Sequence, residues 1–193
     1  MDYKSQKTMT RKAARIIAKI MRKLFGYNDD EVIDPIAMIE LVPDIIPNTF
    51  ISIVENDKLD VNVPARCYFS NNNIIIEIKE EVYEGARIEK IGGYRMHIIH
   101  EISHAVLFNI GYTPSFDRNY KNNELNSYES IEWQAKAVSG EFMIPYDHIN
   151  DLSYKEISEY YGVSIEAAKY SIKLRDGDKN GKTANWDYMS KLS

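Results

Sequence analysis

The sequence predicts an α+β protein in which helices pack around one small β-sheet. Two patterns lead to this prediction. Apolar residues recur at the spacing of amphipathic helices in most of the chain, but between Ile45 and Lys79 they alternate with the period of strands. A length of 193 residues, with 44% apolar side chains, suits one main domain with a small appendage.

The composition bears on two questions, whether the protein binds nucleic acid and in which cellular compartment it works. A net charge of −5 and a sequence pI near 5.5 give no general case for binding nucleic acid. The single cysteine, Cys67, excludes an internal disulfide, favours a reducing cytosol and is expected to be a buried structural thiol. No apolar run approaches the roughly 20 residues of a membrane span, and the polar start does not resemble a secretory signal. The expected location is the cytoplasm, with no membrane partner.

The first predicted helix spans residues 8–25 and ends at Gly26. Its apolar stripe has six members: Ala14, Ile17, Ala18, Met21, Leu24 and Phe25. Residues 1–25 hold eight Lys and Arg against one Asp, a charge of +7, which leaves −12 for the rest of the chain. Such a helix can touch nucleic acid or anionic lipid. We favour a packed helix whose cationic face is solvated or docks on the acidic remainder of the chain.

A second, shorter helix is predicted to follow. Asp34 is the expected N-cap, and Pro35 suits the first helical position because its missing N–H is not needed there. Pro43 is expected to end the helix, since a proline further along removes a hydrogen bond.

Three strands are predicted next, at residues 50–54, 66–69 and 74–78. The last two form a hairpin across residues 70–73, Ser-Asn-Asn-Asn, whose side chains tolerate a tight turn. The third strand precedes the helix described below, so its edge is a candidate for pairing with an extended peptide. A plain structural edge accounts for it equally well.

The most informative stretch is His100-Glu101-x-x-His104. On an α-helix, residues four apart stand on the same face, so the two imidazoles can hold one zinc ion. Glu101 is rotated by about 100° from His100, beside the open side of the metal. Zinc lowers the pKa of a bound water towards about 7, and a nearby carboxylate can take its proton. The pattern predicts a zinc site with Glu101 as the general base.

The alternative is that two histidines fall four residues apart by chance. The chain has only four histidines in 193 residues, so a chance match to all three positions is roughly a one-in-a-hundred event. The flanks also supply the helix that the motif needs, because no proline occurs between Arg87 and Tyr112 and Gly111 suits the C-cap. We therefore interpret the stretch as a metal site.

A zinc site usually needs a third protein ligand. A further helix is predicted from Ser127 to about Met143, with Asn126 as its cap and Glu129 as the capping-box partner. Five downstream residues are candidates for the ligand: Glu124, Glu129, Glu132, Glu141 and His148. Glu132 is favoured because it is expected mid-helix at the margin of the buried stripe, with Glu129 and His148 still open.

The sequence then predicts a helical pair at residues 151–176. Ser153 and Glu156 form a capping box at its start, and the second helix is expected from Ile165 to Leu174. The spacing is that of a helix-turn-helix. Three cations would meet phosphates if the pair bound DNA: Lys169, Lys173 and Arg175. We favour packing of the pair on the rest of the protein. Residues 177–193 are expected to form a flexible tail.

Two stretches together resemble a known family. Residues 95–104, Arg-x-His-Ile-Ile-His-Glu-Ile-Ser-His, and residues 131–145, Ile-Glu-Trp-Gln-Ala-Lys-Ala-Val-Ser-Gly-Glu-Phe-Met-Ile-Pro, are similar to the ImmA/IrrE family of zinc metallopeptidases. The first glutamate of the second stretch, Glu132, matches the family's third zinc ligand. The resemblance extends over most of residues 10–175, while its specific motifs occupy about 25 positions.

The resemblance implies a zincin-like metallopeptidase domain at residues 1–150, with the small twisted sheet packed on the HExxH helix. It implies a cytoplasmic zinc endopeptidase whose protein substrate is a helix-turn-helix transcriptional repressor. Cleavage would derepress genes of a mobile element or a stress response. Lys136, Val138 and Ser139 stand where the family usually has Asn, Phe and Ala, but no ligand and no base is lost.

A second hypothesis from another class is a DNA-associated regulator with a structural or vestigial zinc site. An intact Glu101 favours the enzyme, since a structural site closes its fourth position and has no use for a base. Arg95 is expected to be a structural ion-pair partner. A donor for the oxyanion is also expected, and the sequence leaves four candidates open: Tyr94, Tyr112, Tyr128 and His97. The oligomeric state is left open as well.

Overall fold

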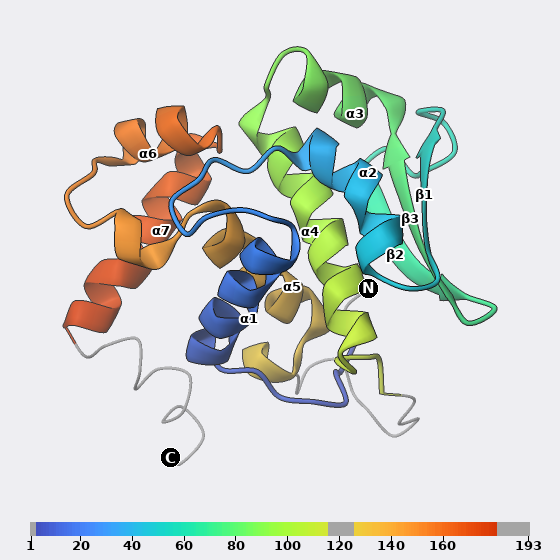
Figure 1. The fold of residues 1–193 in the computed structure, drawn as a ribbon, viewed down its shortest axis with the longest axis horizontal. Coiled ribbons are helices and arrows are strands. Elements are labelled where there is room, and N and C mark those ends of the chain that lie inside the picture. Colours follow the sequence, from blue (N-terminus) through green and yellow to red (C-terminus); the bar gives the residue numbers. More distant parts are fainter. Residues whose placement is uncertain (1–2, 116–125, 181–193) are drawn as a thin grey trace.

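The structure is a computed structural model that describes residues 3–115 and 126–180. Helix α4 (Gly92–Asn109) runs through the middle, with the sheet on one side and helices α5 (Ile131–Met143) and α1 (Arg11–Leu24) on the other (Figure 1). The described part holds seven α-helices and one mixed sheet of three strands, so the α+β class is confirmed. Within it, no helix is long and apolar enough to cross a membrane.

The sheet has the strand order β1-β3-β2, with β1 at Thr49–Val54, β2 at Ala65–Ser70 and β3 at Asn73–Lys79. The predicted hairpin is confirmed, because β2 and β3 pair antiparallel across a turn in which Asn71 and Asn72 both have positive φ. The predicted open edge on the third strand is wrong. β3 is the central strand and also pairs parallel with β1, so the edges belong to β1 and β2.

Four further helices complete the described fold: α2 (Pro35–Ile45), α3 (Glu80–Arg87), α6 (Tyr154–Tyr161) and α7 (Ile165–Lys179). The prediction that Pro43 ends α2 is wrong, since the helix continues to Ile45 and the Ile46 N–H still donates to the Val42 carbonyl at 2.8 Å. A proline in the last turn removes only one hydrogen bond, which this helix tolerates. Helix α3 was not predicted.

Helix α1 docks on its own chain. Ala14, Ala18 and Met21 are buried as predicted, whereas Leu24 is exposed. The cationic face meets acidic residues from the C-terminal half: Arg15 pairs with Glu141 and Asp178, and Lys19 pairs with Asp147.

Arg22, also on α1, is 1% exposed. Its guanidinium donates to three backbone carbonyls, those of Phe142, Asn28 and Glu31, at 2.7–2.9 Å. Because the carbonyl of Phe142 lies near the C-terminal end of α5, Arg22 also satisfies an acceptor that the helix leaves open. This cation is part of the core rather than of a solvated face.

Helix α4 is buried on most sides, which places its polar residues in a largely apolar setting. Ile98, Ile99, Ile102 and Ala105 are fully buried between the sheet and α5. Arg95 has a structural role, but its hydrogen bonds within the described residues go to the carbonyls of Ile33 at 2.6 Å and Gly162 at 3.0 Å, not to an acid.

The helical pair α6–α7 begins with the predicted capping box, and Gly162 ends α6 with a φ of +62°. Helix α7 continues to Lys179, beyond the predicted end at Leu174. Arg175 cannot serve as a phosphate contact, because it is 8% exposed and donates to the carbonyls of Ile149 and Asn150.

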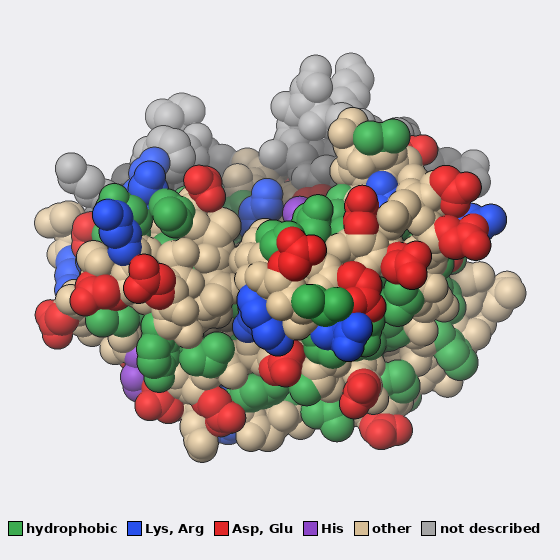
Figure 2. Space-filling model, turned by 90° about the horizontal axis from the view of Figure 1, so that it is seen from above, with side chains coloured by type: hydrophobic (Ala, Val, Ile, Leu, Met, Phe, Trp, Pro, Cys, Tyr) green, Lys and Arg blue, Asp and Glu red, His purple; other side chains and the backbone are tan. Residues whose placement is uncertain are grey.

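On the face in Figure 2, acidic and basic side chains are interspersed, without a continuous cationic patch. The division at residue 150 and the tail remain predictions, and residues 181–193 lie outside the described range.

Candidate metal centre

Helix α4 brings His100 and His104 together as the sequence predicts. They lie one turn apart on the same helix, with ring centroids 4.7 Å apart and ring planes at 86°. The two Nε2 atoms are 3.2 Å apart, so both rings present the same nitrogen to one point. His104 is almost fully buried, while the side chain of His100 is 17% exposed.

The first turn of α5 brings in Glu132. The predicted start of this helix is wrong, because Ser127–Glu129 form a separate 3-10 turn and α5 begins at Ile131. The cap is Ser130, whose Oγ accepts a hydrogen bond from the Trp133 N–H at 2.9 Å. Glu132 therefore sits in the first helical turn rather than mid-helix, and its carboxylate still reaches both histidines.

The three side chains have the spacing of a zinc ligand set. Glu132 Oε2 is 3.2 Å from His100 Nε2, and Glu132 Oε1 is 3.5 Å from His104 Nε2. Ligand atoms about 2.0–2.1 Å from a tetrahedral ion are about 3.3–3.4 Å from one another. The observed separations are close to this value, with one oxygen of the Glu132 carboxylate facing each histidine, so these residues fit the group that the motif implies.

The pKa values of Glu132 and Glu101 are shifted in opposite directions. Hydrogen bonds from His100 and His104 hold the pKa of Glu132 well below its usual range, so it stays a carboxylate. Burial raises the pKa of Glu101 to about 7, against the opposing effects of His100 and a hydrogen bond from the Cys67 backbone N–H. One glutamate is thus kept ionised to bind a cation, and the other is placed where it can both accept and release a proton near neutral pH.

Two further polar groups lie close to the site, the Nδ1 atom of His104 and the thiol of Cys67. His104 Nδ1 is buried without a hydrogen-bond partner among the described residues. The Cys67 thiol is partly buried, and burial followed by the charges of Glu101 and Glu132 raises its pKa, which keeps it a thiol as predicted. Strand β2 therefore borders the metal centre along its outer edge.

The other candidates for the third ligand are occupied or remote. Glu129 pairs with Lys4 at 3.4 Å, and Glu141 pairs with Arg15 at 3.0 Å. His148 lies in the 3-10 turn Tyr146–His148 and lines a different cavity. Glu124 lies outside the described residues.

The N-terminal segment forms backbone hydrogen bonds with the turn before Glu132, an interaction that the sequence did not predict. Residues 3–9 run between the segments at 113–115 and 128–131, in the manner of a short strand. The Ser5 N–H donates to the Glu129 carbonyl at 2.7 Å, and the Ile131 N–H donates to the Tyr3 carbonyl at 3.1 Å. Such pairing leaves no periodic signal in a segment this short.

The four candidates for an oxyanion donor are now distinguished by position. The ring of Tyr94 fills the space beside Gly85, Tyr112 lies under the Lys7 ammonium, and Tyr128 lines the cavity that contains His148. His97 lies one turn before His100 on α4, and its pKa is lowered by partial desolvation and by the charges of His100 and Lys136. His97 thus shares a helix with two of the proposed metal ligands, and its role stays a prediction.

Comparison with known proteins gives a match for the part of the chain that carries the site. Residues 92–173 match the family model described as IrrE N-terminal-like domain, Peptidase_M78. The match confirms the resemblance to the ImmA/IrrE family and indicates a metallopeptidase, although it covers less than the expected range of residues 10–175. Neither the curated proteins nor the solved structures gave a match.

Proposed function

We propose that the chain is a zinc metalloendopeptidase in which His100, His104 and Glu132 hold the metal and Glu101 is the general base. The observation that carries the proposal is the spacing of the ligand groups: the two Nε2 atoms are 3.2 Å apart, and they lie 3.2 and 3.5 Å from the two oxygens of the Glu132 carboxylate. The family match at residues 92–173 supports the same reaction class, since it contains all four residues.

The chain's own residues supply the proton transfers. When bound, zinc polarises the carbonyl of the scissile peptide and makes water more acidic. Glu101 takes a proton from the attacking water and later returns it to the leaving amine. Burial raises the pKa of Glu101 to about 7 without metal, and a bound cation would favour its carboxylate, which is the form that accepts the proton from water.

The outer edge of β2 is the place that we propose for the substrate. Its backbone N–H at Cys67 points toward Glu101, so a peptide that pairs with this edge would lie beside the general base. We propose a transcriptional repressor of the helix-turn-helix class as the substrate, with cleavage in the cytoplasm relieving repression of mobile-element or stress-response genes. This part rests on the family resemblance.

The test is incubation of the zinc-loaded protein with the transcriptional regulator encoded next to it, with and without a chelator. We expect cleavage that the chelator stops. The variant Glu101→Gln should keep one zinc per chain and lose cleavage, because it retains the ligands and loses the base. Cleavage by Glu101→Gln at the wild-type rate would refute the assigned mechanism. Retention of one zinc per chain in His100→Ala would refute the ligand set.

The alternative is a DNA-associated regulator that uses the α6–α7 pair. The exposed side chains of Lys169 and Lys173 on α7 favour this alternative, because exposed cations can approach phosphates. Arg175 does not, because its guanidinium donates to backbone carbonyls. Specific DNA binding that is lost in the double variant Lys169→Gln, Lys173→Gln, together with an absence of proteolysis, would favour the regulator over the enzyme.

A further inference from the structure

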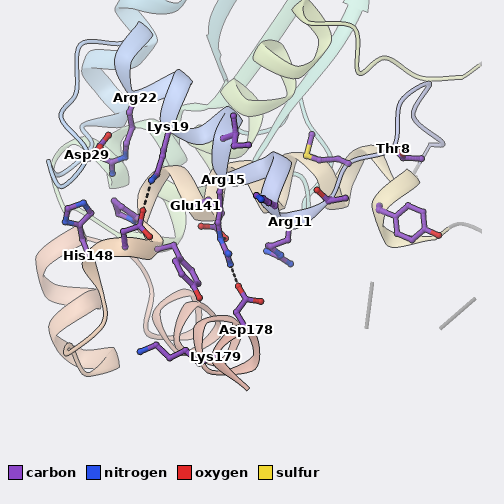
Figure 3. Close-up of a pocket in the computed structure, with 18 residues that line it drawn as sticks. Thr8, Arg11, Arg15, Lys19, Arg22, Asp29, Glu141, His148, Asp178 and Lys179 are labelled. Atoms are coloured by element: carbon purple, nitrogen blue, oxygen red, sulfur yellow. Dashed lines mark hydrogen bonds and ion pairs between the residues drawn. The ribbon is translucent and has the colours of Figure 1, made fainter. Parts of the chain in front are cut away.

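A second cavity, of about 900 Å³, lies between α1 and the C-terminal part of the chain (Figure 3). Its walls include α1, the segment from Pro145 to His148 and the end of α7. None of the three proposed metal ligands lines it. Cavities of a few hundred to about 1,000 Å³ are typical of sites for small organic molecules.

The lining carries a surplus of positive charge. Six Lys and Arg side chains line the cavity against four Asp and Glu side chains, which leaves a charge of +2 with His148 neutral. The whole chain has a charge of −5. Positive charge is thus concentrated in one concave place of an acidic protein, which favours an anionic ligand there.

Three of the four acids form ion pairs, and they do so with only two of the six cations. Figure 3 shows Arg15 and Lys19 directed from α1 toward acidic partners. Arg15 pairs with Glu141 at 3.0 Å and also with Asp178, and Lys19 Nζ is 2.6 Å from Asp147 Oδ2. The fourth acid, Asp29, raises the pKa of Lys19 as well.

Three cations are left without an acidic partner. Arg22 uses its donors on backbone carbonyls, as described above. Arg11, Lys12 and Lys179 form no ion pair with any residue of the described ranges 3–115 and 126–180. The surplus charge of the cavity therefore resides at these three side chains.

Arg11 is held in place by aromatic groups. Its guanidinium lies 5.1 Å from the ring centroid of Trp133 and 5.9 Å from that of Tyr170, and Nη2 donates to the Tyr170 hydroxyl at 3.2 Å. Its Nε is buried and has no hydrogen-bond partner in the described part of the chain. A guanidinium with a defined orientation and an unused donor is suited to a phosphate or carboxylate, which accepts two parallel hydrogen bonds from it.

We propose that this cavity binds a small organic phosphate. Arg11, Lys12 and Lys179 contact the phosphate group, and the apolar and aromatic wall formed by Met9, Ile16 and Tyr146 contacts the organic part. The proposal is independent of the peptidase reaction, because no group of the metal centre takes part. It does not require the metal to be bound.

The test is calorimetric titration of the full chain with AMP, adenosine and inorganic pyrophosphate at constant ionic strength. Each titration is done on zinc-loaded and on chelator-treated protein. We expect AMP and pyrophosphate to bind in both forms and adenosine to bind at least tenfold more weakly than AMP, since it lacks the charged group. Arg11→Gln should weaken AMP binding by a factor of about ten or more.

Lys23→Gln is the matched control, because Lys23 is an exposed cation of α1 that does not line the cavity. It should leave AMP binding within about twofold of the wild type. Lys179→Gln is the second variant, in case Arg11→Gln is misfolded by circular dichroism, and it should also weaken binding. Three results would overturn the proposal: no binding of AMP or pyrophosphate at millimolar concentration, binding only to the zinc-loaded form, or equal weakening in Lys23→Gln.

Discussion

Removal of the N-terminal segment should weaken metal binding without touching a ligand. The perturbation is a truncated variant that lacks residues 1–6. Four backbone hydrogen bonds are lost, of which two hold Glu129 and Ile131, directly before Glu132 in the chain. His100 and His104 keep their positions, because they lie on the buried helix α4.

The magnitude follows from those two hydrogen bonds. A backbone hydrogen bond contributes a net free energy of about 0.5–1.5 kcal/mol, so the turn that carries Glu132 loses roughly 1–3 kcal/mol of local stability. If this loss appears in full in the free energy of zinc binding, affinity falls by a factor of about 5 to 150. The ion pair between Lys4 and Glu129 adds little, since its 3.4 Å separation is long and the Lys4 side chain is 38% exposed.

The assay is competition for zinc against a chromophoric chelator, with circular dichroism as a check on folding. Lys4→Ala is the control variant, because it removes the ion pair with Glu129 and keeps the backbone hydrogen bonds of the segment, so it should bind zinc as the wild type does. If the truncated protein is folded and binds zinc within twofold of the wild type, the N-terminal segment does not position the third ligand and the reasoning is refuted.

Four more predictions concern stability and are measured by urea denaturation. Arg22→Met should cost about 3–5 kcal/mol, because three buried or partly buried carbonyls lose their donor; a loss below about 1 kcal/mol would contradict this. Gly92→Ala should destabilise by about 1–3 kcal/mol, since the new Cβ would lie 2.4 Å from a backbone atom of the α6–α7 turn. Gly93→Ala, with open space around its Cβ, should stabilise by up to about 1 kcal/mol. Hydrogen bonds with Ser153 lower the pKa of Glu156, so the stability it contributes is present above the unfolded-state pKa and is lost as the pH falls through the lower folded-state pKa; equal pH profiles for wild type and Glu156→Gln would contradict this.

The proposed metal centre was largely predictable because its main signal is local. His100, Glu101 and His104 lie within one and a half turns of a helix, and helical spacing alone determines how their side chains stand. Glu132 was favoured as the third ligand because it was expected in the middle of a helix, whereas it lies in the first turn of α5. The helix begins at Ile131 rather than Ser127 because Ser130 takes over the cap while the turn before it pairs with the N-terminal segment.

The charged residues show where sequence patterns fail. The cationic face of the first helix was expected to be solvated or docked on acidic residues, and Arg175 was a candidate phosphate contact, yet Arg22 and Arg175 are both buried and donate to backbone carbonyls. The carbonyls of Phe142 and Ile149 come from segments 120 and 26 residues away from these arginines, so no local pattern predicts the contacts. The position of β3 at the centre of the sheet is non-local in the same way, since its pairing with β1 joins residues 25 positions apart, as in Thr49 and Ile74.

The sequence by itself determined the helical turns, the hairpin and the pair of imidazoles on one face, because each depends on neighbours within a few residues. The tertiary structure alone decided which carboxylate meets those imidazoles, which strand edge borders them and which cations are left over to line a second cavity. These outcomes depend on how distant segments pack, and packing is governed by shape and by the pairing of buried polar groups, which periodicity does not encode.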